Sequence, residues 1–138
     1  MGILRTLEKQ KTICIIAFSI YILVVLKLTI FRQNVYYEER QLNLALFTGL
    51  INTYRYTGIG EFIRLFFGNI FWFIPLGIFL PMFLRKRNFL IIIVIGFMFS
   101  LTIETIQYIF HKGVAELDDL ILNTFGVAMG YYVFKWLY

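Results

Sequence analysis

The sequence is short of the residue types on which many soluble folds and sites depend. It holds one cysteine, one histidine and two prolines in 138 residues, and only 15 % of its residues are charged. A single cysteine forms no internal disulfide, which excludes a disulfide-stabilised secreted module. The one histidine, His111, has no second imidazole with which to build a metal-ligand set. We therefore expect neither a metal nor another cofactor.

Established catalytic motifs are also missing. The chain contains no H-E-x-x-H, no G-x-S-x-G, no Walker A sequence and no paired Cys/His zinc pattern. These absences favour a protein that is not an enzyme.

Apolar residues, by contrast, are abundant. They make up 60 % of the chain, and the mean hydropathy is +0.79, which is more apolar surface than a soluble domain of this size can bury. In a soluble protein the net charge of +5 would suggest a nucleic-acid partner. In a membrane protein the informative property is how the basic residues are distributed between the two sides of the membrane. The composition predicts a polytopic membrane protein without a nucleic-acid partner.

Four apolar segments are each about twenty residues long, enough to cross a hydrocarbon core of about 30 Å as a helix. They cover residues 12–31, 66–84, 89–110 and 120–137. The sequence therefore predicts an all-α membrane protein, a bundle of four transmembrane helices in a single domain, 1–138. Pro75 is expected to kink the second span.

The basic residues predict the orientation of this bundle. Seven lie in short segments on the side of the termini: Arg5, Lys9, Lys11, Arg85, Lys86, Arg87 and Lys135. Five are spread over the two longer loops on the other side: Arg32, Arg40, Arg55, Arg64 and Lys112. Because positive charge collects on the cytoplasmic side, both termini are expected to be cytoplasmic.

The first outer loop, residues 32–65, is rich in tyrosine and leucine and is expected to lie on the membrane. Ile59, Phe62, Ile63, Phe66 and Phe67 follow a helical spacing, which predicts an interfacial helix leading into the second span. A plain surface loop with its tyrosines at the membrane boundary is the alternative.

A polar stripe runs along the third span. Ser100, Glu104, Gln107 and His111 are spaced by four, three and four residues and so share one helix face. A carboxylate within a span is costly and calls for a partner or a function. The alternative is that the stripe only joins helices by hydrogen bonds.

Lys27 and Glu104 lie at matching depth in the outer half of the membrane, each fifteen residues from the inner end of its span. We expect them to form an ion pair or to share a water-lined pocket. Alternatively, Lys27 extends alone to the outer surface.

Polar residues also mark the start of the fourth span. Asp118 and Asp119 suit a helix N-terminus, where one carboxylate can cap free amides. Asp119 then shares a face with Asn123, Gly126 and Gly130. The two glycines form a G-x-x-x-G pattern, which allows close helix approach and leaves a homo-oligomer open.

These segments converge on one predicted binding site in the outer leaflet. Its residues are Lys27, Asn69, Glu104, Gln107, Asp119 and Asn123. If the protein is an enzyme instead, Glu104, Asp118 and Asp119 are the candidate catalytic groups, as acids, bases or ligands of a divalent cation.

Several motifs together resemble the VanZ-like family of small bacterial membrane proteins. They are Asn43-Leu44 followed by Phe47, GNIFWFIPLG at 68–77, SLTIETIQ at 100–107 and LDDLILNTFG at 117–126. The resemblance covers residues 24–132. Leu46 stands where many relatives have proline, and an arginine that many carry before the acidic pair is missing here.

The resemblance implies a cytoplasmic-membrane protein that lowers susceptibility to glycopeptide antibiotics with a lipid tail, the teicoplanin class. In one hypothesis the protein binds or displaces amphiphiles, its partners being membrane lipids, a lipoglycopeptide or a lipid-linked cell-wall precursor. In a second it is an enzyme that modifies a lipid-linked substrate. A transport role is the third, and four spans serve it only in an oligomer.

Overall fold

The computed structural model describes residues 2–30, 37–84 and 88–138. This part of the chain forms five helices and two short strands. In order they are α1 (Gly2–Ile30), β1 (Gln41–Asn43), α2 (Thr48–Thr57), α3 (Ile59–Phe83), α4 (Phe89–Ile109), β2 (Val114–Glu116) and α5 (Leu117–Leu137). The helical prediction is confirmed. The strands, which the sequence analysis missed, pair in parallel, with Leu42 opposite Ala115.

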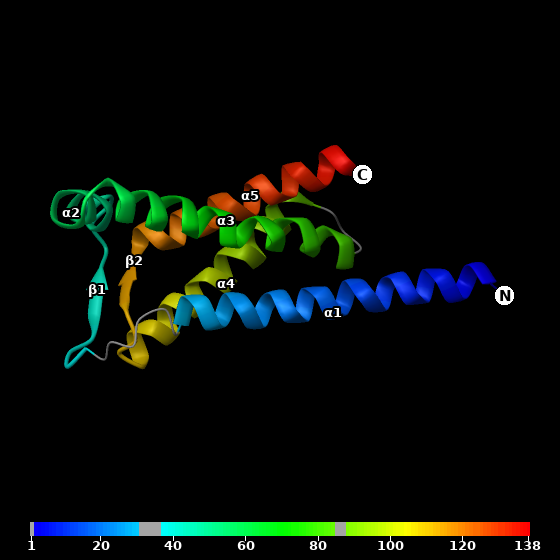
Figure 1. The fold of residues 1–138 in the computed structure, drawn as a ribbon, viewed down its shortest axis with the longest axis horizontal. Coiled ribbons are helices and arrows are strands. Elements are labelled where there is room, and N and C mark those ends of the chain that lie inside the picture. The colour runs from blue at the N-terminus through cyan, green and yellow to red at the C-terminus, as the bar shows by residue number, and fades with distance from the viewer. Residues whose placement is uncertain (1, 31–36, 85–87) are drawn as a thin grey trace.

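The four long helices, α1, α3, α4 and α5, run between two ends of the molecule, and the described ends of the chain lie at the same end (Figure 1). The short helix α2 and both strands lie at the opposite end. We call this second end the α2 end. The core between the long helices is apolar and includes Val25, Phe73, Ile92, Ile103 and Val127.

Three of these helices are long and apolar enough to cross a membrane: Lys9–Ile30 of α1, α3 and α4. Helix α5 has 21 residues, but two aspartates, Asn123 and Lys135 lower its hydropathy, and it does not meet the same criterion. The chain is thus a membrane protein, while a fourth span stays a prediction.

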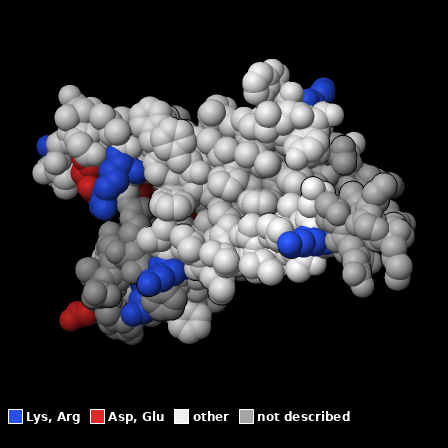
Figure 2. All heavy atoms as spheres, turned by 45° about the vertical axis from the view of Figure 1, so that its right-hand side comes forward, with Lys and Arg blue, Asp and Glu red and all other residues white. Residues whose placement is uncertain are grey.

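The surface fits this assignment. On the face that Figure 2 shows, the charged side chains lie toward the two ends and an uncharged band separates them. Large apolar side chains such as Leu23, Phe71 and Leu90 are more than half exposed, so lipid rather than protein would cover them.

The helix bounds differ from the predicted spans at two places. Helix α1 begins at Gly2, well before the predicted residue 12, and its predicted last residue, Phe31, lies outside the described residues. The residues expected to form an interfacial helix are the first turns of α3, which continues through Pro75 and Pro81. A separate helix, α2, precedes them, and its position at a membrane interface stays a prediction.

Glycines allow α5 to pack closely on α3. A Cβ atom on Gly126 would overlap the Ile70 carbonyl, and one on Gly130 would overlap the Ile74 carbonyl. Gly77 of α3 faces Gly130 in the same way. The G-x-x-x-G pattern therefore serves contact within the chain, so its glycine face is already occupied and gives no support to self-association.

Candidate functional site

A cavity of about 300 Å³ lies among the four long helices. Its wall is polar on α5 and mixed on α1, α3 and α4. The lining residues are Leu28, Thr29, Arg64, Gly68, Asn69, Trp72, Ile103, Glu104, Gln107, Asp119 and Asn123. We call it the main cavity. It contains five of the six predicted binding residues.

Hydrogen bonds join the polar residues of neighbouring helices around it. The side-chain amide of Asn69 on α3 donates to Asp119 on α5. Asn123, only 3 % exposed, donates from Nδ2 to Oγ of Ser100 on α4 at 2.9 Å. These bonds hold α3, α4 and α5 in register where α5 begins.

Glu104 is the most buried carboxylate on the cavity wall, with 6 % of its surface exposed. One of its oxygens accepts a hydrogen bond from the backbone amide of Glu116 at 3.0 Å. Because Glu116 ends β2 and directly precedes α5, this bond ties the third predicted span to the strand segment. Burial without such donors would cost a carboxylate heavily.

Gln107 stands between the main cavity and a second one. Its Nε2 donates to the backbone carbonyl of Thr29 on α1 at 2.9 Å. The second cavity, about 180 Å³, lies toward the α2 end and shares Thr29, Gln107 and Asp119 with the first. It adds Glu116 and Lys112 to the charged residues nearby.

The adjacent aspartates have different surroundings. Asp119 lines both cavities. Asp118 is 3 % exposed and accepts a hydrogen bond from the backbone amide of Phe47 at 2.7 Å. Phe47 has a left-handed φ of 59° and precedes α2. Asp118 therefore holds the corner between β1 and α2, and it lines neither cavity.

The expected ion pair between Lys27 and Glu104 is wrong. Lys27 is exposed and does not line the main cavity, and within the described part of the chain no ion pair joins it to Glu104. The face of α1 that packs on the core carries Tyr21, Ile22, Val25 and Leu26. Lys27 lies at the level of the main cavity, since the next two residues of α1 line it, but its side chain is not on the face that packs on the core.

His111, the last member of the polar stripe, lies outside the main cavity. Its Nδ1 is 2.9 Å from the carbonyl oxygen of Tyr37, and its own carbonyl accepts the Tyr37 amide at 3.1 Å. Ser100, the first member, bonds Asn123. Ser100 therefore joins two helices, Glu104 and Gln107 line the main cavity, and His111 is bonded to a loop residue.

Several cavity residues on α1 and α3 were not predicted from the sequence. Arg64 lines the main cavity and forms a two-point ion pair with Glu61, one bond being Nε to Oε2 at 2.8 Å. Arg64 falls within the predicted interfacial helix, but the helical spacing there does not indicate which residue lines a cavity. Gly68 and Trp72 belong to the GNIFWFIPLG motif at 68–77, which marks the segment but not a cavity, and Thr29 belongs to no motif.

The strand pair brings another motif to the same end. Asn43 of β1 donates to Oε1 of Glu116 on β2 at 3.2 Å, and its own oxygen accepts from the Ala45 amide and the Thr48 hydroxyl. Three of the four motifs therefore supply Asn43, Glu104, Asp118 and Asp119 to one region. The fourth supplies Asn69.

The main cavity can bind a polar group within an otherwise apolar bundle. Among the described residues, no group of three or more His, Cys, Asp or Glu side chains is placed to hold a metal ion. Glu104 and Asp119 could exchange protons with a bound ligand, whereas Asp118 is separated from the cavity.

Comparison with known proteins identifies related sequences. The VanZ/LLP1 family model matches residues 18–138. Protein VanZ of Enterococcus faecium is 35 % identical over 94 residues, which are 68 % of this chain and 52 % of that protein. The chain thus spans about half the length of the curated relative it matches. No solved structure matches.

Proposed function

Because the chain belongs to the VanZ/LLP1 family, we propose that it lowers bacterial susceptibility to glycopeptide antibiotics with a lipid tail, the teicoplanin class. The proposed mechanism is binding of an amphiphile in the main cavity. The amphiphile is a membrane lipid, the lipoglycopeptide or a lipid-linked cell-wall precursor.

The observation that carries this proposal is the combination of buried polar side chains with an open volume. Glu104 and Asn123 are more than nine-tenths buried, yet both line a cavity of about 300 Å³. Polar residues that only join helices would close on one another and leave no such volume. A ligand with a polar head and an apolar chain suits these walls.

The proposal includes four membrane spans with both termini in the cytoplasm. In that orientation the α2 end faces the outside, and the main cavity lies in the outer half of the membrane. A lipid-tailed antibiotic inserts its chain into the same leaflet, which brings it within reach of the cavity.

The test uses susceptibility in a Gram-positive host that lacks the protein. Glu104→Gln and Asp119→Asn are compared with wild type and with Glu39→Gln, an exposed carboxylate outside the cavity. The two cavity variants should lose protection against teicoplanin at equal membrane abundance, and Glu39→Gln should keep it. Full protection by both cavity variants would contradict the proposal, and equal protection against vancomycin would contradict the role of the lipid tail.

A second candidate function is modification of a lipid-linked substrate. It is favoured by one observation, that two carboxylates, Glu104 and Asp119, line the same cavity. An enzyme would add or remove a lipid or precursor species when the protein is expressed, and Glu104→Gln would abolish that change. A binder would leave the lipid and precursor profile unchanged.

A further inference from the structure

Three side-chain amides line the main cavity, one from each of the helices α3, α4 and α5. They belong to Asn69, Gln107 and Asn123. Each donates one hydrogen bond within the protein, and the acceptors are Asp119, the Thr29 carbonyl and Ser100 respectively. Because an amide nitrogen carries two hydrogens, each of the three amides keeps a second N–H donor.

Two of these amides also keep an acceptor. In the described part of the chain, Oε1 of Gln107 and Oδ1 of Asn123 are buried and have no hydrogen-bond partner. A buried polar atom without a partner costs free energy, which a ligand can recover by pairing with it. The terminal torsion of an amide side chain is soft, so a small rotation turns the oxygen toward the cavity. Each of the two amides therefore offers a ligand both a donor and an acceptor.

A hydroxyl group is the ligand group that matches such an amide, because it donates one hydrogen bond and accepts others. An ammonium group only donates and a phosphodiester only accepts, so either would leave half of the capacity of each amide unused. A hydroxyl also serves both orientations of the Asn123 amide, whose neighbour is itself a hydroxyl, that of Ser100.

The charged side chains of the cavity wall have partners within the protein. Glu104 and Asp119 each accept a hydrogen bond from a protein donor and have further interactions. Arg64 forms its ion pair with Glu61. A neutral ligand bonds to the amides, and to the indole N–H of Trp72 on the same wall, without breaking these pairs or adding a charge that needs a new partner.

The size and the surroundings of the cavity suit a headgroup with several hydroxyls on an alkyl chain. Its volume of about 300 Å³ is about ten times the ~30 Å³ that one water molecule occupies in the liquid. The second cavity continues it toward the α2 end past Gln107. On the other side Leu28 and Trp72 line the main cavity and are each more than one-third exposed. A chain can therefore leave between α1 and α3 into the membrane.

We propose that the main cavity binds a neutral headgroup with several hydroxyl groups, the glycosyl or glycerol head of an amphiphile, through the amides of Asn69, Gln107 and Asn123. This inference rests on the proposed function in taking the same cavity as the site, and it adds the chemical class of the headgroup. The amides donate to hydroxyl oxygens and accept from hydroxyl hydrogens. The alkyl chain lies against Leu28 and Trp72.

The protein carries its own reporter for a binding test. It has two tryptophans, of which Trp72 lines the cavity and Trp136 is exposed near the end of α5. In the Trp136→Phe protein, fluorescence therefore reports on the cavity alone. The protein is purified in dodecylphosphocholine and placed in phosphatidylcholine nanodiscs, so that neither detergent nor lipid brings a hydroxyl group to the site.

Four compounds with the same dodecyl chain are titrated into the nanodiscs: the glucoside, the glycerol ether, the tetrahydropyranyl ether and the ammonium. Their affinities are compared as mole fractions in the nanodisc, which removes differences in partitioning. The tetrahydropyranyl ether has the ring of the glucoside without its hydroxyl groups. Methyl glucoside is the soluble counterpart without a chain. The comparison of the glucoside with the glycerol ether identifies which of the two heads the cavity prefers.

The preferred hydroxylated compound should bind about tenfold or more tightly than the tetrahydropyranyl ether, because each lost hydrogen bond weakens binding several-fold. It should also bind more tightly than dodecylammonium. Gln107→Leu should weaken its binding about threefold to tenfold. Gln10→Leu, the same change at an exposed position of α1 outside the cavity, should leave binding unchanged. The comparison of ligands uses an unaltered cavity, so it stands even where Gln107→Leu disturbs the fold.

Equal affinity for the hydroxylated compounds and the tetrahydropyranyl ether, tighter binding of dodecylammonium, or equal effects of the two glutamine variants would each overturn the inference. Displacement of dodecyl glucoside by an equal concentration of methyl glucoside would assign the site to a soluble sugar and overturn the amphiphile. Loss of teicoplanin protection in Glu104→Gln without a preference for hydroxyl groups would overturn this inference and leave the proposed function standing. A hydroxyl preference with unchanged protection in Glu104→Gln and Asp119→Asn would do the reverse.

Discussion

Single residues in this protein have roles that neighbouring positions do not share. Asp118 and Asp119 are adjacent, but successive helical residues point in directions about 100° apart. Asp118 therefore bonds the Phe47 amide while Asp119 lines both cavities. Helical spacing predicted that Asp119 shares a face with Asn123. The partner of Asp118 could not be predicted, because it lies 71 residues away in a loop.

A substitution at Gly68 tests the role of the main cavity without removing a polar group. It lines the main cavity, and an added Cβ there would meet no atom within 4 Å. Gly68→Leu should fill this space and abolish protection against teicoplanin. The thermal unfolding temperature in detergent should stay equal or rise, because glycine costs a helix about 1 kcal/mol.

Gly60→Leu is the matched control for Gly68→Leu. Gly60 also lies in α3 with no atom near an added Cβ, but it does not line the main cavity. This variant should keep full protection. Retained protection in Gly68→Leu, at normal abundance, would show that the cavity is not the functional site.

At the scale of elements, the long helices were predictable and the short elements were not. Apolar runs of about twenty residues indicate helices directly from the cost of unpaired backbone groups in lipid. The strands β1 and β2 have three residues each, too few to show an alternating pattern. They pair across 73 positions of sequence, as Asn43 with Glu116, a contact that local patterns do not indicate.

Local sequence patterns also limited which residues of the candidate site could be predicted. Spacing within one helix correctly grouped Glu104 with Gln107 and Asp119 with Asn123. Contacts between helices depend on which face each helix turns inward, and a mostly apolar helix such as α1 shows this face only weakly. Sequence spacing therefore predicts Lys27 in the site, although Lys27 is exposed, and does not predict Arg64, which lines the main cavity.

The glycine contact between α3 and α5 makes a prediction at this scale. Gly130→Ala should destabilise the protein by about 1–3 kcal/mol, because the new methyl group overlaps the Ile74 carbonyl and forces the helices apart. Thermal unfolding in detergent measures the change. Gly68→Ala, in open space, serves as control and should be neutral or stabilising. An unchanged unfolding temperature for Gly130→Ala would contradict the close packing.

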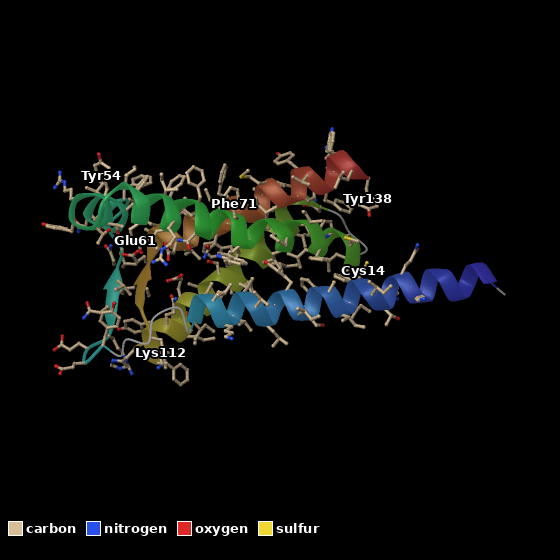
Figure 3. The ribbon with its side chains drawn as sticks, viewed as in Figure 1. Cys14, Tyr54, Glu61, Phe71, Lys112 and Tyr138 are labelled. Carbon is tan, nitrogen blue, oxygen red and sulfur yellow. The ribbon has the colours of Figure 1, made fainter. Side chains whose placement is uncertain are left out.

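At the scale of the whole molecule, the two ends of the helix bundle differ in the residues and cavities that lie there. Glu61 and Lys112 lie at the α2 end, while Cys14 and Tyr138 lie toward the other (Figure 3). The second cavity is lined in part by residues of α2 and β2, and the main cavity adjoins it through Thr29, Gln107 and Asp119. Within its apolar segment α1 is far less buried than α3 or α4. One side of the main cavity is therefore bounded by the helix that touches the bundle least.

The distribution of basic residues between the two ends predicts which end faces out of the cell. Lysine and arginine near the termini favour a cytoplasmic location for that end, so the α2 end should be reachable from outside the cell. In a Cys14→Ala background, which removes the single native cysteine, Glu39→Cys and Tyr138→Cys place one thiol at each end. Both native residues are exposed.

A membrane-impermeant maleimide should label the Glu39→Cys protein in intact cells and leave the Tyr138→Cys protein unlabelled until the membrane is permeabilised. Residue 39 precedes β1, and α5 begins beside that strand pair, so the two results together would mean that α5 crosses the membrane. Labelling of both proteins in intact cells would show that α5 stays on the outer side and that the chain has three spans. Labelling of Tyr138→Cys alone would invert the orientation, and the cavity would then serve the inner leaflet, out of reach of an antibiotic anchored in the outer one.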